Sequence, residues 1–129
     1  MPTRQVAGSV LSSLKSAGLI AKEIRPEEGD EHDSNHIRVA TMHRAKGLEF
    51  DAVFITGIEE GLFPHENSLS DADGVEEERR LMYVAITRAR QRLYLSFSQT
   101  RLLHGQTRCN VKSRFFDELP EAALKWLSP

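Results

Sequence analysis

The sequence contains a single cysteine, Cys109, among its 129 residues. One cysteine excludes an internal disulfide and a cysteine-based metal cage, and it fits a reducing compartment. No apolar run approaches the roughly 20 residues that a membrane-spanning helix needs, and the N-terminus lacks a secretory hydrophobic region. We therefore expect a soluble, cytoplasmic protein that makes no membrane contact.

The chain also lacks an excess of positive charge. Its 17 Lys and Arg residues and 19 Asp and Glu residues give a formal net charge of -2 at pH 7. This balance argues against a surface that coats nucleic acid broadly, so any contact with DNA or RNA must use a local patch. The proportions of apolar residues (40%) and charged residues (28%) are ordinary for a globular domain.

The first 36 residues show one helical pattern and one polar stretch. Apolar residues recur at helical spacing over residues 6–18 and the pattern ends in a glycine, which predicts a short amphipathic helix. Residues 19–24 fit a strand or a loose arm, and residues 26–35, PEEGDEHDSN, read as an acidic linker. His32 and His36 lie in or beside this linker, where isolated histidines are more often solvated than metal-bound.

Strand patterns follow. Residues 37–42 alternate in polarity, and residues 52–55 are apolar on both faces, which is typical of a parallel sheet covered by helices. Residues 93–98 alternate as a third strand. The loop before the main helix, residues 57–74, is long enough to suggest a function. Further short helical segments are expected at residues 101–104, 113–119 and 121–127, the last anchored by Trp126.

The most informative stretch is residues 76–95, EEERRLMYVAITRARQRLYL. It predicts a helix that runs into a strand, because three glutamates stand where the helix dipole is positive, and Asp73 with Glu76 forms a capping-box pattern. The apolar residues at helical spacing predict one face that lies on a sheet. These residues are Leu81, Met82, Ala85, Ile86 and Ala89.

Arg88 lies at the margin of that apolar face, nearly above Leu81. Together with Arg90 and Arg92 it is expected at the C-terminal end of the helix, where cations are favoured. Two interpretations are open. Arg88 is either a snorkelling arginine with a packed stem and a hydrated head, or an arginine held at a cleft for a phosphate. On this segment alone, the first arrangement is the more common one.

A second polar group follows the first predicted strand, in TMHRAKGLEF (residues 41–50). Ligands of open α/β sheets bind at the carboxyl ends of strands, so site chemistry is expected in this loop. Thr41 and His43 offer hydrogen bonds at that edge. Gly47 permits close backbone approach, and Glu49 supplies a carboxylate. By itself, the pattern also fits an ordinary turn with a satisfied histidine.

Taken in order, two segments resemble motifs V and VI of the UvrD/Rep/PcrA-type superfamily 1 DNA helicases: TMHRAKGLEFDAVF and EEERRLMYVAITRARQRLYL. The intervening GIEEGLFPH and the later SRFFDELP fit the same family, so the resemblance runs from about residue 37 to residue 120. Several motifs in the right order and spacing make it specific. It implies an ATP-dependent 3′-to-5′ DNA helicase, in which two RecA-like domains clamp ATP between them.

The resemblance also implies a fold class and domain boundaries. The element order is that of a layered α/β domain, but about three strands are too few for a whole sheet. We expect a partial RecA-like domain of the P-loop NTPase type, with three layers and a mostly parallel sheet. Residues 36–120 would form the C-terminal half of the second RecA-like domain. Residues 1–35 would be an N-terminal helix and linker, and residues 121–129 a tail. Apolar surface is expected to be exposed where the missing half would pair.

The resemblance assigns Arg88 to the ATP site as the arginine finger that reaches the γ-phosphate. Gly47 and Glu49 would face the same nucleotide. The Walker A pattern, G-x-x-x-x-G-K followed by Ser or Thr, is absent, and so is an acidic Mg²⁺ motif. ATP with Mg²⁺ is therefore expected only in an intact enzyme whose preceding helicase domains supply those parts. We expect no metal site in this chain, and no activity from the chain alone.

Single-stranded DNA is the expected partner of the remaining candidates. Thr41 and His43 would contact its backbone. Phe63 and His65 are further candidates for DNA contact, although packing of Phe63 under its own loop is an equal alternative. Arg79 and Arg80 are expected to be solvated or ion-paired with the glutamates that precede them, with a contribution to the interdomain surface as the alternative.

Two other functions stay open. The chain is alternatively a non-catalytic module of the same fold that binds single-stranded DNA or protein, for which DNA binding without ATP dependence would be the sign. It is alternatively the helicase part of a helicase–nuclease complex, which shares these motifs.

Overall fold

The computed structural model describes residues 4–24, 37–103, 105–109 and 111–127. The linker predicted at residues 26–35 lies outside these ranges, as do His32 and His36. The described elements, in chain order, are α1 (Arg4–Ser16), β1 (Ala21–Glu23), β2 (Ile37–Val39), β3 (Phe50–Ile55), α2 (Gly74–Ile86), β4 (Ala89–Leu95), β5 (Thr100–Leu103) and β6 (Gln106–Cys109), with the short 3-10 helices η1 (Glu66–Ser70), η2 (Arg114–Glu118) and η3 (Glu121–Ala123). Among them, no helix is both long and apolar enough to cross a membrane.

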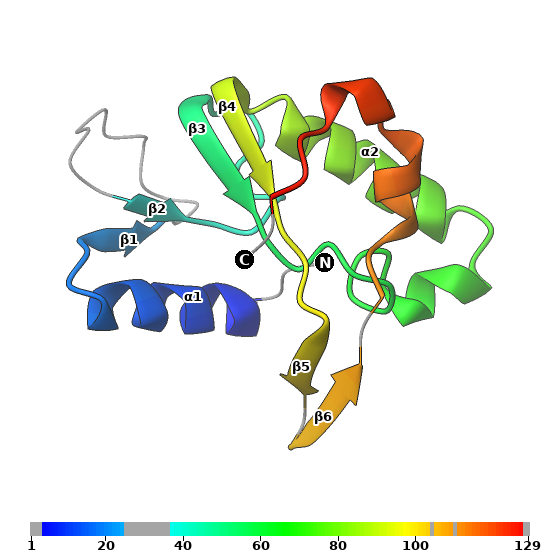
Figure 1. Ribbon diagram of the computed structural model, residues 1–129, viewed down its shortest axis with the longest axis horizontal. Helices are drawn as coiled ribbons and strands as arrows, with labels where there is room; N and C mark the ends of the chain where they lie inside the picture. The colour runs from blue at the N-terminus through cyan, green and yellow to red at the C-terminus, as the bar shows by residue number, and fades with distance from the viewer. Residues whose placement is uncertain (1–3, 25–36, 104, 110, 128–129) are drawn as a thin grey trace.

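The described strands pair two by two (Figure 1). β1 pairs with β2 and β3 pairs with β4, both in parallel, whereas β5 and β6 form an antiparallel hairpin. The prediction of a small α/β fold with parallel strands is confirmed. The described strands do not join into one sheet, because β2 pairs with β1 and not with β3.

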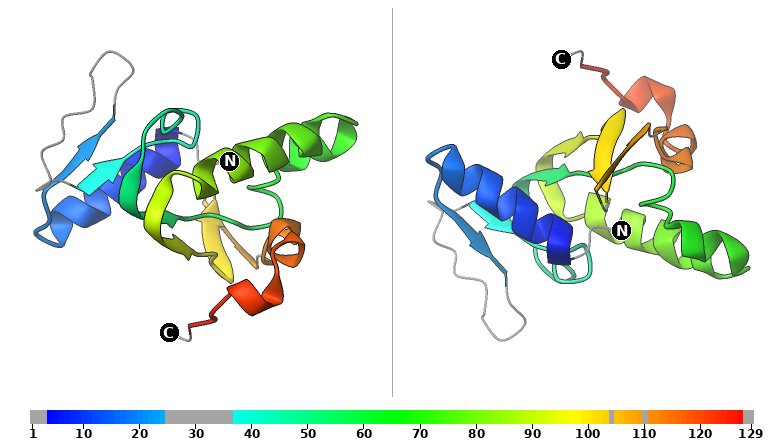
Figure 2. Two further views of the ribbon diagram at one scale, coloured as in Figure 1. Left: turned by 90° about the horizontal axis from the view of Figure 1, so that it is seen from above. Right: turned by 90° about the horizontal axis from the view of Figure 1, so that it is seen from below.

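The main core lies between α2 and the β3–β4 pair (Figures 1 and 2). The predicted apolar face of the helix is confirmed, because Met82 and Ala85 are buried and Leu81 and Ile86 pack against the same cluster. The cluster also takes side chains from the loop after β3 and from η2. Its buried members are Met42, Ile55, Ile58, Phe63, Met82, Ala85, Phe115 and Phe116.

Both ends of α2 differ from the prediction. The helix ends at Ile86, and Ala89 already pairs with Phe50 in the parallel ladder. Arg90 and Arg92 therefore lie in β4 rather than at the helix end, because strand pairing overrides local helical pattern. At the N-terminal end, Asp73 makes no side-chain cap, so the capping box is not formed.

The opposite face of β3 and β4 is open. Phe54 is 70% exposed and stacks on Tyr94, with the ring centroids 4.4 Å apart. The prediction that residues 52–55 are buried on both faces is thus wrong for this chain, since only one face is covered by α2. The open face agrees with the expectation of exposed apolar surface beside a missing half of the sheet.

The N-terminal helix and strand form a second, smaller unit. The helix predicted at residues 6–18 is confirmed as α1, and it ends as expected at Gly18, whose φ is 83°. The Leu19 N–H donates to the Leu14 carbonyl and the Gly18 N–H to the Lys15 carbonyl, the two bonds of a Schellman motif. α1 then packs on the β1–β2 pair through Val10, Leu11 and Leu14.

The C-terminal predictions have mixed outcomes. The helical segment at residues 113–119 is confirmed as η2, whose N-cap Ser113 accepts a hydrogen bond from the Phe115 N–H. The prediction of a helical turn at residues 101–104 is wrong, because residues 101–103 lie in β5. β5 and β6 form a hairpin that projects away from the rest of the chain in Figure 1. Of residues 121–127, only η3 is helical, and Trp126 is half exposed beside Phe116.

Gly74, the first residue of α2, is required by close packing. A Cβ at this position would lie 2.6 Å from the Ser68 carbonyl oxygen, which is backbone and cannot rotate away. We expect Gly74→Ala to lower the free energy of unfolding by about 1–3 kcal/mol. Gly8→Ala is the matched control, because Gly8 is inside α1 with open space around it. This change is expected to raise the free energy by about 0.5–1 kcal/mol.

Urea denaturation followed by circular dichroism measures both changes. A rise in the free energy of unfolding in both variants would contradict this account, because helix propensity alone would then explain both effects.

Candidate functional site

The loop between β2 and β3 folds as a series of tight turns. The Arg44 N–H donates to the Thr41 carbonyl and the Leu48 N–H to the Ala45 carbonyl, both at 3.0 Å. Gly47 has a φ of 86°, a left-handed conformation that glycine adopts without strain, and the space beside its Cα is open within the described residues. His43, Gly47 and Glu49 are all exposed. The loop thus presents its polar side chains to solvent on a backbone held by its own turns.

Arg88 stands at the junction of this loop and α2. Its Nε donates to the Val84 carbonyl at 3.1 Å, and its Nη1 donates to the Leu48 carbonyl at 3.2 Å. A third bond runs from Nη2 to the Thr87 hydroxyl oxygen at 3.3 Å. The structure therefore brings together two segments that are 40 residues apart in sequence. Both interpretations of Arg88 have support, since it caps the helix end and also reaches the second predicted site segment.

The positive charge of Arg88 has no counterion in the part of the chain that the structure describes. Its three acceptors are two backbone carbonyls and one hydroxyl, all uncharged. The next arginine in the sequence is different. Arg90 pairs with Asp51 at 3.1 Å, in an exposed pair. A half-buried arginine held by neutral groups keeps its full charge available for an anion.

Arg79 is ion-paired, as expected. It contacts Glu76 one turn earlier, and its Nε donates to Glu118 at 2.6 Å. The hydrogen bond to Glu118 raises the pKa of Arg79 above its usual value. The sequence analysis missed the Glu118 partner, because it comes from η2, 39 residues away. These bonds tie η2 to α2 and leave Arg79 no free charge for a ligand.

The candidate ATP residues lie at the amino ends of strands. Gly47 and Glu49 immediately precede β3, and Arg88 immediately precedes β4. The Phe50 N–H donates to the Arg88 carbonyl at 2.8 Å, and this bond holds the segments that lead into β3 and β4 side by side. Thr41, a candidate DNA contact, instead follows the carboxyl end of β2. The expected position at the carboxyl end of a strand therefore holds for Thr41 but not for Gly47 and Glu49, which lie at the amino end of β3.

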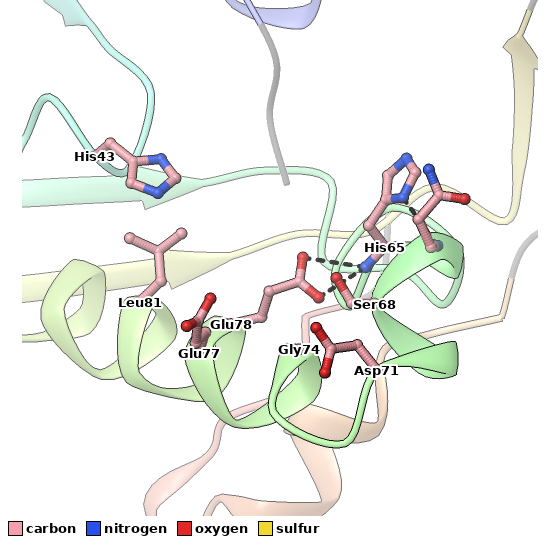
Figure 3. Close-up of a pocket in the computed structure, with 9 residues that line it drawn as sticks. His43, His65, Ser68, Asp71, Gly74, Glu77, Glu78 and Leu81 are labelled. Carbon is pink, nitrogen blue, oxygen red and sulfur yellow. Dashed lines mark hydrogen bonds between the residues drawn. The ribbon is translucent and has the colours of Figure 1, made fainter.

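His43 and His65 line the same cavity, which has a volume of about 480 Å³ (Figure 3). The His65 Nδ1 accepts from the Asn67 N–H at 3.1 Å as the N-cap of η1, so only its other ring nitrogen is left for a ligand. The remaining residues come mostly from η1 and α2. The full lining is His43, His65, Asn67, Ser68, Asp71, Gly74, Glu77, Glu78 and Leu81.

Glu78 is a buried carboxylate that the sequence analysis missed. It is 7% exposed and accepts from the His65 N–H through both oxygens, at 3.1 and 3.0 Å (Figure 3). The available signal was its position three and four residues before Leu81 and Met82, on the apolar face of the helix. Asp71 and Glu77 add two more carboxylates to the cavity, which makes it unfavourable for phosphate. Among the described positions, no group of three or more His, Cys, Asp or Glu residues is arranged to hold a metal.

Phe63 is fully buried and its ring lies edge-on to Phe115, with the centroids 5.1 Å apart. A ring without exposed surface has no face on which a DNA base can stack. Of the two alternatives for Phe63, the structure favours packing under its loop.

Comparison with known proteins gives one consistent result. The family model of the UvrD-like helicase C-terminal domain matches residues 7–100. The match therefore begins within α1, well before residue 37, where the resemblance seen in the sequence begins, and it ends before residue 120. The chain is 44% identical over 119 residues to the ATP-dependent DNA helicase UvrD1 of Mycobacterium tuberculosis, an alignment that covers 92% of this chain and 15% of that protein.

Two further relatives agree. The ATP-dependent DNA helicase PcrA of Staphylococcus epidermidis is 51% identical over 119 residues, covering 90% of this chain and 16% of that protein. The ATP-dependent DNA helicase Rep of Buchnera aphidicola is 45% identical over 97 residues, covering 75% and 15%. The chain thus spans between 15% and 16% of the length of these curated relatives. It belongs to the UvrD-like helicase C-terminal domain family.

Proposed function

We propose that this chain is the C-terminal part of a cytoplasmic, ATP-dependent DNA helicase with 3′-to-5′ polarity, in which it completes the second of two RecA-like domains. Family membership supports the proposal, and the three relatives named above are ATP-dependent DNA helicases. Since the matched segment is a small part of each relative, the preceding helicase domains are the first partner that the chain requires. The open apolar face of β3 and β4 is consistent with such a partner.

The observation that carries the proposal is the geometry of Arg88. Its guanidinium is held by neutral acceptors, without a carboxylate among the described residues, beside the Leu48 carbonyl. In the assembled enzyme, Arg88 acts as the arginine finger: it lies against the γ-phosphate of ATP and stabilises the charge that develops in the transition state. Gly47 and Glu49, on either side of Leu48, face the same nucleotide.

Magnesium accompanies ATP in this chemistry and neutralises charge on the phosphates. The donor set of the described residues does not fit a Mg²⁺ site. In the proposed enzyme, the Mg²⁺ ligands and the phosphate-binding loop come from the preceding domains. This chain contributes the cation that reaches the nucleotide from the other side.

Single-stranded DNA is the proposed second ligand. Thr41 and His43, at the start of the loop that ends at Glu49, hold its backbone. His65 lines the same cavity as His43. Because the carboxylates of that cavity disfavour phosphate, His65 is proposed to contact a base or a sugar of the DNA, through the ring nitrogen that does not cap η1. Because one short loop connects these DNA contacts to Glu49 and to the Leu48 carbonyl that Arg88 binds, a shift of the loop on ATP hydrolysis moves the DNA contacts too.

We expect the 129-residue chain alone neither to hydrolyse ATP nor to unwind DNA, because it lacks the phosphate-binding loop. Phosphate release from Mg-ATP in the presence of single-stranded DNA measures the first activity, and a labelled duplex with a 3′ tail measures the second. DNA-stimulated hydrolysis by the chain alone, lost in Arg88→Ala, would show that a complete site lies within these residues and would overturn the proposal.

A second candidate function is a non-catalytic module that binds single-stranded DNA. The observation in its favour is that backbone hydrogen bonds within residues 41–48 hold this loop in its turns, so that DNA contacts made by the loop need no nucleotide. Titration of a labelled oligonucleotide, with and without ATP, separates the two. Oligonucleotide binding by the full-length protein that is lost in a His43 variant and is unchanged by ATP favours the non-catalytic module.

A further inference from the structure

Thr87 lies between the last residue of α2 and Arg88. Its hydroxyl oxygen is 3.0 Å from the carbonyl oxygens of both Tyr83 and Val84, and 3.3 Å from Nη2 of Arg88. A hydroxyl has one hydrogen to donate and lone pairs with which to accept. Thr87 therefore shares its one hydrogen between the carbonyls of Tyr83 and Val84, in the last turn of α2, and accepts from the guanidinium at the same time.

The other contacts of the guanidinium differ in kind. Nε and Nη1 of Arg88 bond the Val84 and Leu48 carbonyls, which are backbone groups present whatever side chains stand there. Across the described residues, Thr87 is the only side chain that bonds the Arg88 guanidinium. Its β-branched side chain also has few χ1 rotamers, so the hydroxyl is a stationary acceptor.

We infer that Thr87 is a positioning residue for Arg88, an inference that rests on the proposed role of Arg88 as the arginine finger. Arginine has a long side chain whose rotamer freedom must be lost before it can stabilise a transition state. Three acceptors at three different nitrogens hold the plane of the guanidinium across the end of α2 before nucleotide arrives. The Arg88 side chain is thus already ordered when the phosphate arrives. Because this order serves the interaction made in the transition state, it raises kcat rather than the affinity for ATP.

Two variants separate positioning from a role in ending the helix. Thr87→Val keeps the branched shape and removes the hydroxyl, whereas Thr87→Ser keeps the hydroxyl. In the full-length helicase, we expect Thr87→Val to lower kcat for DNA-stimulated ATP hydrolysis about five- to tenfold, the effect of losing one hydrogen bond of ordinary strength. The KM for ATP is expected to stay within about twofold, and Thr87→Ser is expected to restore most of kcat.

A double-mutant cycle gives the decisive comparison. If Thr87 acts through Arg88, Thr87→Val has no further effect in the Arg88→Ala background. An equal loss of kcat in both backgrounds, or a failure of Thr87→Ser to restore kcat, would overturn the inference. A normal kcat in the Arg88→Ala enzyme would be a different result, because it would reject the proposed function. The positioning of the Arg88 side chain by Thr87 would then be decided by the measurement that follows.

That direct test uses the 129-residue chain and needs no ATP. Nuclear magnetic resonance of the Arg88 side-chain nitrogens reports rotation about the Nε–Cζ bond, which a hydrogen bond at Nη2 slows. Thr87→Val is expected to speed this rotation, and Thr87→Ser to leave it near the wild-type rate. Equal rotation in all three proteins would show that the hydroxyl does not hold the guanidinium.

Discussion

Replacement of Arg88 by alanine in the full-length helicase is expected to lower kcat for DNA-stimulated ATP hydrolysis by about 10³-fold, the smallest effect typical of an arginine finger. The KM for ATP should change much less, because the interaction develops with charge on the transferring phosphoryl group. Steady-state phosphate release with saturating single-stranded DNA measures both constants. Arg88→Lys should recover only part of the loss, since an ammonium cannot bond the Val84 and Leu48 carbonyls and a phosphate with one planar fork.

The matched control is Arg90→Ala, two residues further along the chain. Arg90 is exposed and already paired with Asp51, so its removal should leave kcat within about twofold. The competing interpretation of Arg88, as a cap for the end of α2, makes a different prediction. If Arg88→Ala lowers the midpoint of thermal unfolding but leaves kcat near wild type, the cap is its role and the finger is not.

The local patterns in the sequence predicted the elements whose cause is local. Gly18 ends α1 because a glycine there adopts a left-handed conformation, and the spacing of Met82 and Ala85 identifies the buried face of α2. Ser113 caps a short helix through its own side chain. In each case the deciding interaction lies within a few residues, where a pattern in the sequence can reveal it.

The features that sequence reasoning missed are decided by residues far apart. The end of α2 falls at Ile86 because the following residues pair with β3, and no helical pattern contains that information. The β5–β6 hairpin was mistaken for a helical turn, although Gly105, with a φ of 77°, marks its bend. The sequence patterns placed Glu78 in the first turn of the helix and assigned Glu118 no role, because their partners, the His65 N–H and Arg79, lie 13 and 39 residues away.

The candidate site likewise combines residues that sequence motifs predicted with contacts between distant residues that they could not predict. Motif resemblance selected Arg88, Gly47 and Glu49 as one ATP group, and the Arg88 bond to the Leu48 carbonyl supports their proximity. Neither periodicity nor composition could have predicted that bond, because it spans 40 residues. What the structure adds is that no carboxylate within the described ranges forms an ion pair with Arg88. That feature distinguishes an arginine available to phosphate from one that stabilises only the fold.

Phe63→Ala is expected to lower the free energy of unfolding by about 3–5 kcal/mol, the largest stability effect of any single change in this chain that we predict. Phe63 has no exposed surface, and it joins the loop after β3 to η2 through its contact with Phe115. Removal of the ring leaves a cavity at the centre of the main core. For a domain of this size, such a loss is a large part of its total stability. Urea denaturation followed by tryptophan fluorescence, with Trp126 beside Phe116 as the probe, measures it.

Phe54→Ala is the matched control, because it removes the same ring from a position that is 70% exposed. Its loss should cost about 1 kcal/mol or less, from the stacking on Tyr94. The pair also tests the DNA-facing alternative for Phe63. If Phe63→Ala left the unfolding midpoint unchanged but weakened binding of a labelled oligonucleotide, the ring would have to leave the core when DNA binds. We expect instead that Phe63 acts on DNA binding only through the fold, because the loop that carries His65 rests on its buried ring.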